Sequence, residues 1–309
     1  MSRAAIPEFA ITIIAPAPAL PEITELETLL AHHGSNVIDR RDLPVPRSLA
    51  AKRSARVLLL GQVADSQRLS LELDVLAESL GVDLVLQSSE VRQADYKLAV
   101  FDMDSTLIQC EVIDQLAIRA GVGEEVAAIT ESAMRGELDF KGSFTQRLGM
   151  LRGMSESALA EVAANLPITE GMPELILTLR ARGIRTAILS GGFNYFAQCL
   201  QDRFGFDEYH ANTLELVDGK ATGRVASEIV DGARKRHFLE TIAGEMGIEH
   251  SQVIAVGDGA NDLPMLGVAG LGIAFEAKPI VRQQAAHNIR HVGLDGVLYL
   301  LGAASEVGG

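Results

Sequence analysis

Two aspartates follow an apolar run in the stretch Val100-Phe101-Asp102-Met103-Asp104-Ser105-Thr106. The apolar residues 98–101 are typical of a buried strand, and side chains two positions apart on extended backbone point to the same side. Asp102 and Asp104 are therefore expected side by side where this strand ends. One carboxylate can act there as a nucleophile or metal ligand, and the other as a proton carrier. The spacing alone also fits a solvated turn or a helix-capping acid.

A second apolar run ends in acids, in the segment Val253-Ile254-Ala255-Val256-Gly257-Asp258-Gly259-Ala260-Asn261-Asp262. Two such endings in one chain make coincidence a poor explanation. A third strand, predicted over 184–189, leads into Ser190-Gly191-Gly192, where glycines let backbone N–H groups approach an anion and Ser190 adds a hydroxyl donor. Ligands bind beyond the carboxyl ends of the strands in an open parallel sheet. We therefore expect the three endings to enclose one site.

The composition is that of a globular protein with an acidic balance. The chain has 309 residues, of which 48% are hydrophobic and 22% charged, and this length suits about two domains. The formal net charge of −14 opposes binding to nucleic acid and to anionic lipid, so neither is expected as a partner.

Cysteine and histidine patterns favour an oxygen-bound metal. The two cysteines, Cys110 and Cys199, form no C-x-x-C pair, and the seven histidines show no H-x-H or H-E-x-x-H pattern.

Residues 9–15 are apolar, but Glu8 precedes them and prolines follow, which favours a first strand over a signal peptide. No apolar run approaches the ~18 residues of a membrane helix, so a cytoplasmic location is expected.

The first 92 residues are predicted to form a small α+β ferredoxin-like domain. Its basic residues are expected in a solvated loop rather than in a nucleic-acid patch, because no aromatic residues lie among them: Arg40, Arg41, Arg47, Lys52, Arg53 and Arg56. The fold prediction rests on the order of the predicted elements, β-α-β-β-α-β, which is typical of the ferredoxin-like fold. The predicted strands cover 8–15, 36–42, 56–61 and 82–87, and the helices cover 21–33 and 65–80.

Residues 93–309 are predicted to form an α/β domain around a Rossmann-like parallel sheet, because strands alternate with helices. The segment at about 109–170 is far longer than the dozen residues of a crossover, which indicates a helical cap over the strand ends. Asp218-Gly219 marks a β-hairpin within 212–225, and the tail 302–309 is expected to fray. Further strands are predicted over 252–256, 271–275 and 288–292.

Four motifs occur in order: Asp102-Met103-Asp104-Ser105-Thr106, Ser190-Gly191-Gly192-Phe193, Lys235, and the glycine- and aspartate-rich segment 257–262. With them, residues 96–301 resemble the haloacid dehalogenase-like phosphohydrolases and, within these, the phosphoserine phosphatases. The front domain resembles the ACT regulatory family more loosely. That family usually has a glycine at the first strand-to-helix turn, where this chain has Ala15-Pro16-Ala17-Pro18-Ala19-Leu20. Effector binding, docking and dimerisation all stay open for this domain, and a homodimer is one expected assembly.

The resemblance implies Mg²⁺-dependent hydrolysis of O-phospho-L-serine to L-serine and phosphate, the last step of serine biosynthesis. Asp102 would attack phosphorus and form an aspartyl-phosphate, and Asp104 would protonate the leaving alkoxide. The Mg²⁺ would be held by Asp102, Asp258 and the backbone carbonyl of Asp104. The phosphate would be bound by Ser190, by Gly191 through its N–H, and by Lys235. Asn261 and Asp262 would orient Lys235 and the metal shell, and Asp262 could instead cap the short helix that follows it.

The resemblance places substrate selection in the cap. Glu111 would bind the substrate amine, Arg147 would bind its carboxylate, and Met134 and Phe140 would form an apolar lining. Taken alone, Glu111 and Arg147 fit surface charges on helices. Two other functions stay open: a phosphotransferase that passes the phosphoryl group to another hydroxyl, such as that of homoserine, and a catalytically silent protein that senses an amino acid. A dinucleotide-binding oxidoreductase is disfavoured, because no G-x-G-x-x-G follows the first strand.

Overall fold

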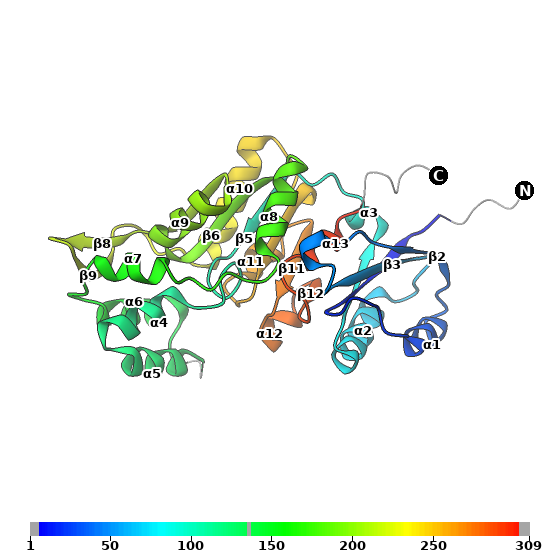
Figure 1. Cartoon of the computed structure of the whole chain (residues 1–309), viewed down its shortest axis with the longest axis horizontal. Helices are drawn as coiled ribbons and strands as arrows, with labels where there is room; N and C mark the ends of the chain where they lie inside the picture. The colour runs from blue at the N-terminus through cyan, green and yellow to red at the C-terminus, as the bar shows by residue number, and fades with distance from the viewer. Residues whose placement is uncertain (1–5, 135–136, 303–309) are drawn as a thin grey trace, which may run out of the picture.

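The computed structural model describes residues 6–134 and 137–302. The molecule is elongated, with a four-stranded domain at one end, a parallel sheet in the middle and a group of helices at the other end (Figure 1). Two of the expectations above, the frayed tail and part of the cap, fall partly on residues outside the described ranges.

The N-terminal domain is an antiparallel sheet in the order β2-β3-β1-β4 with two helices. The predicted β-α-β-β-α-β order is confirmed. Helix α2 begins where Asp65 accepts a hydrogen bond from the N–H of Arg68 at 2.9 Å, and it ends at Gly81, whose φ of 64° suits glycine. The elements are β1 (Phe9–Ala15), α1 (Thr24–His32), β2 (Val37–Asp42), a 3₁₀ turn (Arg47–Leu49), β3 (Ser54–Leu60), α2 (Ser66–Leu80) and β4 (Asp83–Ser88).

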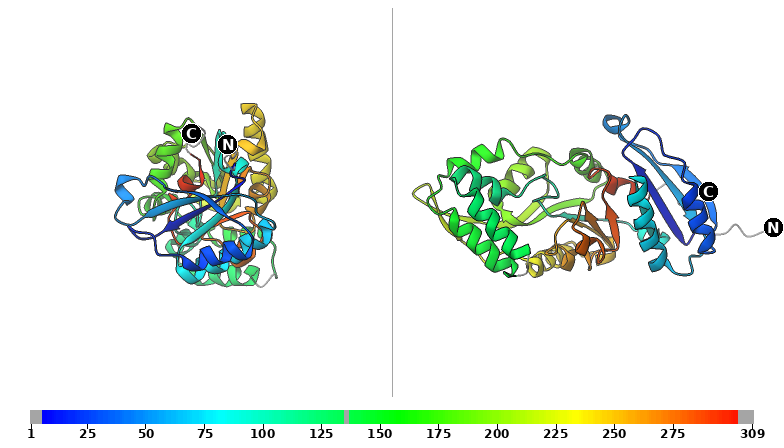
Figure 2. Two further views of the ribbon diagram at one scale, coloured as in Figure 1. Left: turned by 90° about the vertical axis from the view of Figure 1, so that its right-hand side faces the viewer. Right: turned by 90° about the horizontal axis from the view of Figure 1, so that it is seen from below.

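Both faces of this small sheet are covered. Ile11 and Ile13 pack with the apolar residues of α1 and α2 on one face. On the other face Ile14, Ala55 and Val85 belong to the same apolar cluster as the large parallel domain. Figure 2 shows the N-terminal domain seated against one end of that domain, to which the short helix α3 (Ser89–Arg92) connects it.

The large domain contains a six-stranded parallel sheet in the order β12-β11-β10-β5-β6-β7, which confirms the Rossmann-like prediction. Strand β5 lies in the middle of the sheet and is buried along its whole length, as its apolar sequence requires. The strands are β5 (Leu98–Phe101), β6 (Arg185–Phe193), β7 (Glu208–Asn212), β10 (Val253–Gly257), β11 (Leu271–Phe275) and β12 (His287–Ile289).

Helices cover both faces of the parallel sheet. Helices α8 (Met172–Ala181) and α9 (Asn194–Phe204) contribute Leu175 and Phe196 to the apolar cluster on one face. Helix α10 (Gly232–Met246) contributes Leu239 to the cluster on the other face. The remaining short helices of this domain are α11 (Leu263–Leu266), α12 (Pro279–Arg282) and α13 (Gly296–Leu300), with a 3₁₀ turn at His250–Gln252.

The segment between β5 and α8 forms the predicted helical cap, with α4 (Val112–Ala120), α5 (Gly123–Met134), α6 (Phe140–Met150) and α7 (Ser157–Ala163). The predicted hairpin, β8 (Leu214–Val217) and β9 (Lys220–Val225), touches this cap. The N–H of Gly153 donates to the carbonyl of Ala221 at 2.8 Å, and the N–H of Ala221 donates to that of Met154 at 2.9 Å. The core hairpin therefore supports the cap directly.

The expectation that the basic residues lie in a solvated loop is wrong for Arg53, which is buried. Its side chain is 1% exposed, because its guanidinium meets the buried carboxylate of Asp295 in the other domain. Arg56 and Lys52, by contrast, keep exposed side chains. None of the helices in the described part of the chain has the length and apolar character that a membrane span requires.

Candidate active site

Asp102 directly follows β5 and is 5% exposed. One of its carboxylate oxygens, Oδ1, accepts a hydrogen bond from the N–H of Met103 at 2.7 Å and lies 2.8 Å from Nζ of Lys235. Burial and the neighbouring charge of Asp262 raise the pKa of Asp102 above its ordinary value, and Lys235 opposes this shift. Lys235 is therefore the neighbouring group that favours the anionic form of Asp102, against burial and the adjacent carboxylates.

Lys235 is fully buried between two carboxylates. It lies in α10, which begins where Asp231 accepts from the N–H of Arg234 at 2.9 Å. Its Nζ is 2.7 Å from Asp262 Oδ1, in addition to its contact with Asp102. Burial alone would lower the pKa of Lys235, but the two aspartates raise it above its ordinary value, so the ammonium stays charged. The predicted place of Lys235 in the site is thus a buried positive charge against the nucleophile.

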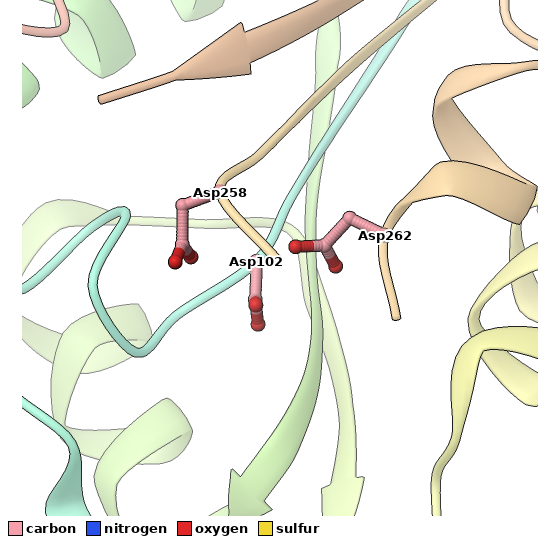
Figure 3. A group of neighbouring side chains, drawn as sticks. All are labelled: Asp102, Asp258 and Asp262. Carbon is pink, nitrogen blue, oxygen red and sulfur yellow. The ribbon is translucent and has the colours of Figure 1, made fainter. Parts of the chain in front are cut away.

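Asp102, Asp258 and Asp262 converge, with one carboxylate oxygen from each within 4.8 Å of the others. Figure 3 shows the three side chains next to one another, with Asp262 pointing toward Asp102, on the loops after β5 and β10. Glycines make this possible, because a Cβ on Gly257 would lie 2.5 Å from Cγ of Asp262. Burial and the charge of Asp262 raise the pKa of Asp258 to about 7.

The donor set fits a hard divalent cation. All three groups are carboxylates, and Mg²⁺ prefers oxygen ligands of this kind. A cation among them would offset the repulsion that raises the pKa of Asp258. The structure therefore supports a metal-holding group of carboxylates. The identity of the metal and the use of the Asp104 carbonyl as a ligand stay predictions.

Asp262 faces the site rather than capping α11. No side-chain hydrogen bond from Asp262 caps this helix, and its Oδ2 instead accepts from the N–H of Gly259 at 2.9 Å. Asn261 lies in the same loop, with Oδ1 beside Gly259. The orienting role of Asp262 toward Lys235 has its geometric basis here, whereas the role of Asn261 stays a prediction.

Asp104 lies next to the nucleophile with part of its carboxyl group uncommitted. Its Oδ1 is buried and finds no hydrogen-bond partner within the described part of the chain. Burial and the charges of Glu111 and Asp102 raise the pKa of Asp104 well above its ordinary value. A carboxyl group with a raised pKa is protonated more readily near neutral pH and can donate its proton. The next residue, Ser105, has a φ of 58°, a left-handed conformation that is rare for residues other than glycine and clusters at functional turns.

Strand β6 continues through Ser190, Gly191 and Gly192 to Phe193, beyond the end predicted at residue 189, and its two glycines leave no room for side chains. A Cβ on Gly192 would lie 2.7 Å from Asp104 Oδ2, and one on Gly191 would lie 3.0 Å from the ring of Phe140. Ser190 is fully buried, and its Oγ accepts from the N–H of Gly192 at 2.9 Å. The glycines therefore bring backbone close to both the acid and the cap.

Asn212, at the end of β7, braces the C-terminal end of β6 and was not among the residues that the sequence predicted. Its Nδ2 donates to the carbonyl of Gly191 at 2.7 Å, and its Oδ1 accepts from the N–H of Val230 at 2.9 Å. No motif marks this asparagine, because its partners come from two other segments. Asp114 was also not predicted from the sequence, although a signal for it exists. It lies three residues after Glu111, and residues three apart share one face of a helix, so it could have been expected near the other charged residues of the cap.

Of the residues predicted in the cap, Glu111 and Phe140 lie beside the strand ends. Glu111, at the start of α4, accepts a hydrogen bond from Ser105 Oγ at 3.2 Å. Arg147, in α6, is largely buried, and its NH1 lies 4.0 Å from Asp114 Oδ1. Phe140 begins α6, and its ring lies beside Gly191 at the C-terminal end of β6, as described above. Met134 is the last residue of α5, and its side chain lies outside what the structure describes.

Comparisons with known proteins identify the family. Residues 96–270 match the family model of the haloacid dehalogenase-like hydrolases. The chain is 47% identical over 230 residues to the phosphoserine phosphatase of Streptomyces coelicolor, a match that covers 74% of this chain and 56% of that protein. It is 48% identical over 211 residues to the phosphoserine phosphatase of Streptococcus thermophilus, covering 68% of this chain and 97% of the relative.

A solved structure extends the likeness to the N-terminal domain. The crystal structure of a haloacid dehalogenase family hydrolase from Salmonella enterica serovar Typhi has a TM-score of 0.83 and 32% identity, and the match covers 96% of this chain and 99% of that one. The family match includes the loops that carry Asp102 and Asp258. The chain therefore belongs to the haloacid dehalogenase-like hydrolase family.

Proposed function

We propose that this protein is a phosphoserine phosphatase, which hydrolyses O-phospho-L-serine to L-serine and phosphate with Mg²⁺ as cofactor. One observation carries the proposal: Asp102, Lys235, Asp258 and Asp262 converge beneath a cap that carries Glu111 and Arg147. The names of the relatives support the choice of substrate. A cytoplasmic location and a homodimer stay predictions.

The first half-reaction transfers the phosphoryl group to Asp102. A carboxylate that attacks a phosphate dianion meets charge repulsion, and Lys235 lowers this repulsion because its ammonium lies 2.8 Å from Asp102. An oxygen of Asp102 forms a bond to phosphorus while the bond from phosphorus to the serine oxygen breaks. Asp104 gives its proton to that oxygen, so serine leaves as a neutral alcohol.

The second half-reaction returns the enzyme to its starting state. Asp104, now ionised, takes a proton from water as the water oxygen attacks phosphorus. The bond between phosphorus and Asp102 then breaks, and phosphate leaves. Ser190, the N–H of Gly191 at the C-terminal end of β6, and the ammonium of Lys235 bind the phosphoryl oxygens. Bound Mg²⁺, held by Asp102, Asp258 and the Asp104 carbonyl, would supply further positive charge at the phosphoryl group.

The cap provides recognition of the amino acid. Glu111 offers a carboxylate to the substrate ammonium, and Arg147 offers a guanidinium fork to the substrate carboxylate. Phe140 lies beside Gly191, at the end of β6 that would bind the phosphate, and its ring would form one apolar wall of the site. A substrate without the amino and carboxylate groups cannot make these contacts with Glu111 and Arg147.

A panel of phosphomonoesters, assayed for phosphate release with and without Mg²⁺, tests the proposal. We expect phosphoserine to have the highest kcat/KM, and we expect chelation of the metal to abolish turnover that added Mg²⁺ restores. Preference for an ester without amino and carboxylate groups would contradict the substrate assignment. Undiminished turnover after chelation would contradict the metal assignment. Candidate alcohols added to the same assay would reveal transfer instead of hydrolysis, as a new phosphate ester.

Asp102→Asn tests the nucleophile. The amide cannot form the aspartyl-phosphate, so we expect kcat to fall on the order of 10⁴-fold or more while the fold is kept. Circular dichroism and the melting temperature serve as controls for folding. Turnover of phosphoserine near the parental rate would exclude Asp102 as the attacking group.

A further inference from the structure

We propose that the N-terminal domain positions the cap, with Arg53 as the positioning residue that acts through Asp295 on the segment returning from the cap to the core. The inference rests on the proposed function for its kinetic test only. The phosphoserine phosphatase of Streptococcus thermophilus matches this chain over 97% of its own length but over only 68% of this chain. The match leaves part of this chain uncovered, and we ask what the N-terminal domain adds to the enzyme.

The cap joins the core through two chain segments that pair with each other. The entering segment runs from Ser105 to Glu111, and the returning segment runs from residue 164 to 171. The N–H of Gln109 donates to the carbonyl of Pro167 at 2.8 Å, and the N–H of Thr169 donates to that of Leu107 at 3.1 Å. The two segments therefore form one hinge, and the anchor of the returning segment sets the position of the cap.

The returning segment is anchored on the loop that carries Asp295. The carbonyl of Glu170 accepts a hydrogen bond from the N–H of Leu294 at 2.8 Å. Gly171 has a φ of 76°, and a Cβ at this position would lie 2.6 Å from the backbone nitrogen of Asp295. The backbones thus touch without an intervening side chain. The position of Asp295 is transmitted directly to the base of the hinge.

Arg53 reaches this anchor from the N-terminal domain. Its Nε lies 2.8 Å from Asp295 Oδ2 and its NH2 lies 2.9 Å from Asp295 Oδ1, a bidentate pair that is almost fully buried. The same NH2 is 3.3 Å from Glu170 Oε2, and Lys52 Nζ is 2.9 Å from Glu170 Oε1. The hydroxyl of Tyr299 donates to Asp295 Oδ2 at 3.0 Å. One guanidinium therefore bridges the core loop and the hinge.

The buried pair makes the anchor depend on the N-terminal domain. A buried carboxylate that loses its cation is strongly destabilised and must move, take up a proton or admit water. Any of these changes would shift Asp295 against Gly171 and free the returning segment. Glu111 and Arg147 are carried by helices that follow this hinge, so their placement over Asp102 would become less uniform. The N-terminal domain thus holds the cap in its substrate-binding position.

Steady-state kinetics of Arg53→Met and of Glu170→Gln test the proposal, with Arg56→Met as the matched control. Arg56 lies on β3, which begins directly after Arg53, and it pairs with Asp42 at 2.6 Å within its own domain, away from the hinge. We expect KM for phosphoserine to rise about three- to tenfold in Arg53→Met, because only part of the population keeps the cap in place. We expect a smaller rise in Glu170→Gln and none in the control, with kcat within about twofold throughout. KM for p-nitrophenyl phosphate should not change.

Hydrogen exchange provides a readout that does not need activity. Peptides covering 105–111 and 164–171 should exchange faster in Arg53→Met than in Arg56→Met, whereas peptides of α10 should not differ. If Arg53→Met fails to fold, the double variant Lys52→Met with Glu170→Gln replaces it, because both side chains are partly exposed. Unchanged KM and unchanged hinge exchange would overturn the proposal. If the parental protein does not hydrolyse phosphoserine, the proposed function fails, and the exchange comparison alone decides the role of Arg53.

Discussion

Lys235, Asp102 and Asp104 have separate tasks because their surroundings differ. Burial raises the pKa of both aspartates, but Asp102 lies 2.8 Å from Lys235, and this contact favours the anionic form of the nucleophile. Asp104 has an unpartnered buried oxygen and a raised pKa, which favours its protonated form. Two carboxyl groups two residues apart are therefore suited to opposite roles, one as an anion and one as an acid.

Replacing the acid Asp104 should affect substrates according to their leaving group. Serine leaves as a strongly basic alkoxide that needs a proton, whereas p-nitrophenolate leaves unprotonated. In Asp104→Asn we expect kcat to fall about 10³-fold for phosphoserine, and we expect phosphorylation by p-nitrophenyl phosphate to be affected much less. Rapid-mixing kinetics should show a burst of p-nitrophenol before slow hydrolysis of phospho-Asp102. Equal losses in the first step for both esters would show that Asp104 is not the proton donor.

At the scale of single residues, the sequence predicted those whose position follows from a strand end. Asp102, Asp104 and Asp258 come directly after buried strands, so alternation and topology place them together. Arg53 and Asn212 could not be predicted, because their partners are far away in sequence. Arg53 and Asp295 are separated by 242 positions, and no local pattern records such a pair.

At the scale of helices, α4 and α6 of the cap face each other through charged groups. Arg147 NH1 and Asp114 Oδ1 are 4.0 Å apart, and Arg147 Nε and Asp114 Oδ1 are both buried without a hydrogen-bond partner among the residues described. Asp114 is about half-buried, and burial raises its pKa while Arg147 opposes this shift. The pair thus brings a carboxylate of α4 to the guanidinium of α6 and leaves Nε of Arg147 without a hydrogen-bond partner in the described part of the chain.

Arg147→Ala should raise KM for phosphoserine about 10- to 100-fold, since a charge-assisted contact contributes about 1.5–3 kcal/mol. Asp114→Asn should raise the same KM less, about three- to tenfold, because the guanidinium remains but is less well oriented. A matched measurement with p-nitrophenyl phosphate should show little change in either variant. A comparable rise for both substrates would argue against recognition of the carboxylate by Arg147.

Element boundaries were predictable where periodicity and turn residues agree. The strand predicted over 8–15 is observed as Phe9–Ala15, and the helix predicted over 65–80 as Ser66–Leu80, with Asp65 and Gly81 as its caps. The first helix begins later than predicted, at Thr24, since residues 16–23 form the proline-containing loop. The last strand, predicted over 288–292, pairs only at His287–Ile289, because the backbone that follows turns to meet Asp83.

At the scale of the whole molecule, Asp83 links the two domains and couples their stability to pH. Its carboxyl accepts from the N–H of Arg290 at 2.8 Å and from that of His291 at 3.1 Å. Burial raises its pKa from 3.8 to about 7. Between these two values the folded protein binds more protons than the unfolded chain, so stability falls as the pH rises. The contribution of protonated Asp83 is complete below pH 3.8 and is lost by about pH 7.

Asp83→Asn should remove this part of the pH dependence, because the amide does not ionise. Urea unfolding at pH 5 and pH 7.5 would measure it, with Arg56→Met as a control at a site away from the interface. The parental protein should lose more unfolding free energy between the two pH values than Asp83→Asn does. Identical losses in both proteins would mean that Asp83 titrates alike in the folded and unfolded chains.

The order of the two domains was predictable from the change in pattern near residue 96, but their packing was not. Both faces of the N-terminal sheet are covered, one by α1 and α2 and the other by the parallel domain. Strand β2 is one of the two edge strands of this sheet, and four charged residues follow one another along it: Asp39, Arg40, Arg41 and Asp42. A charged rim of this kind discourages growth of the sheet by a strand from another molecule. Pairing of a strand from another molecule along β2 is therefore disfavoured, so this edge is a poor place for two copies of the chain to join into one sheet.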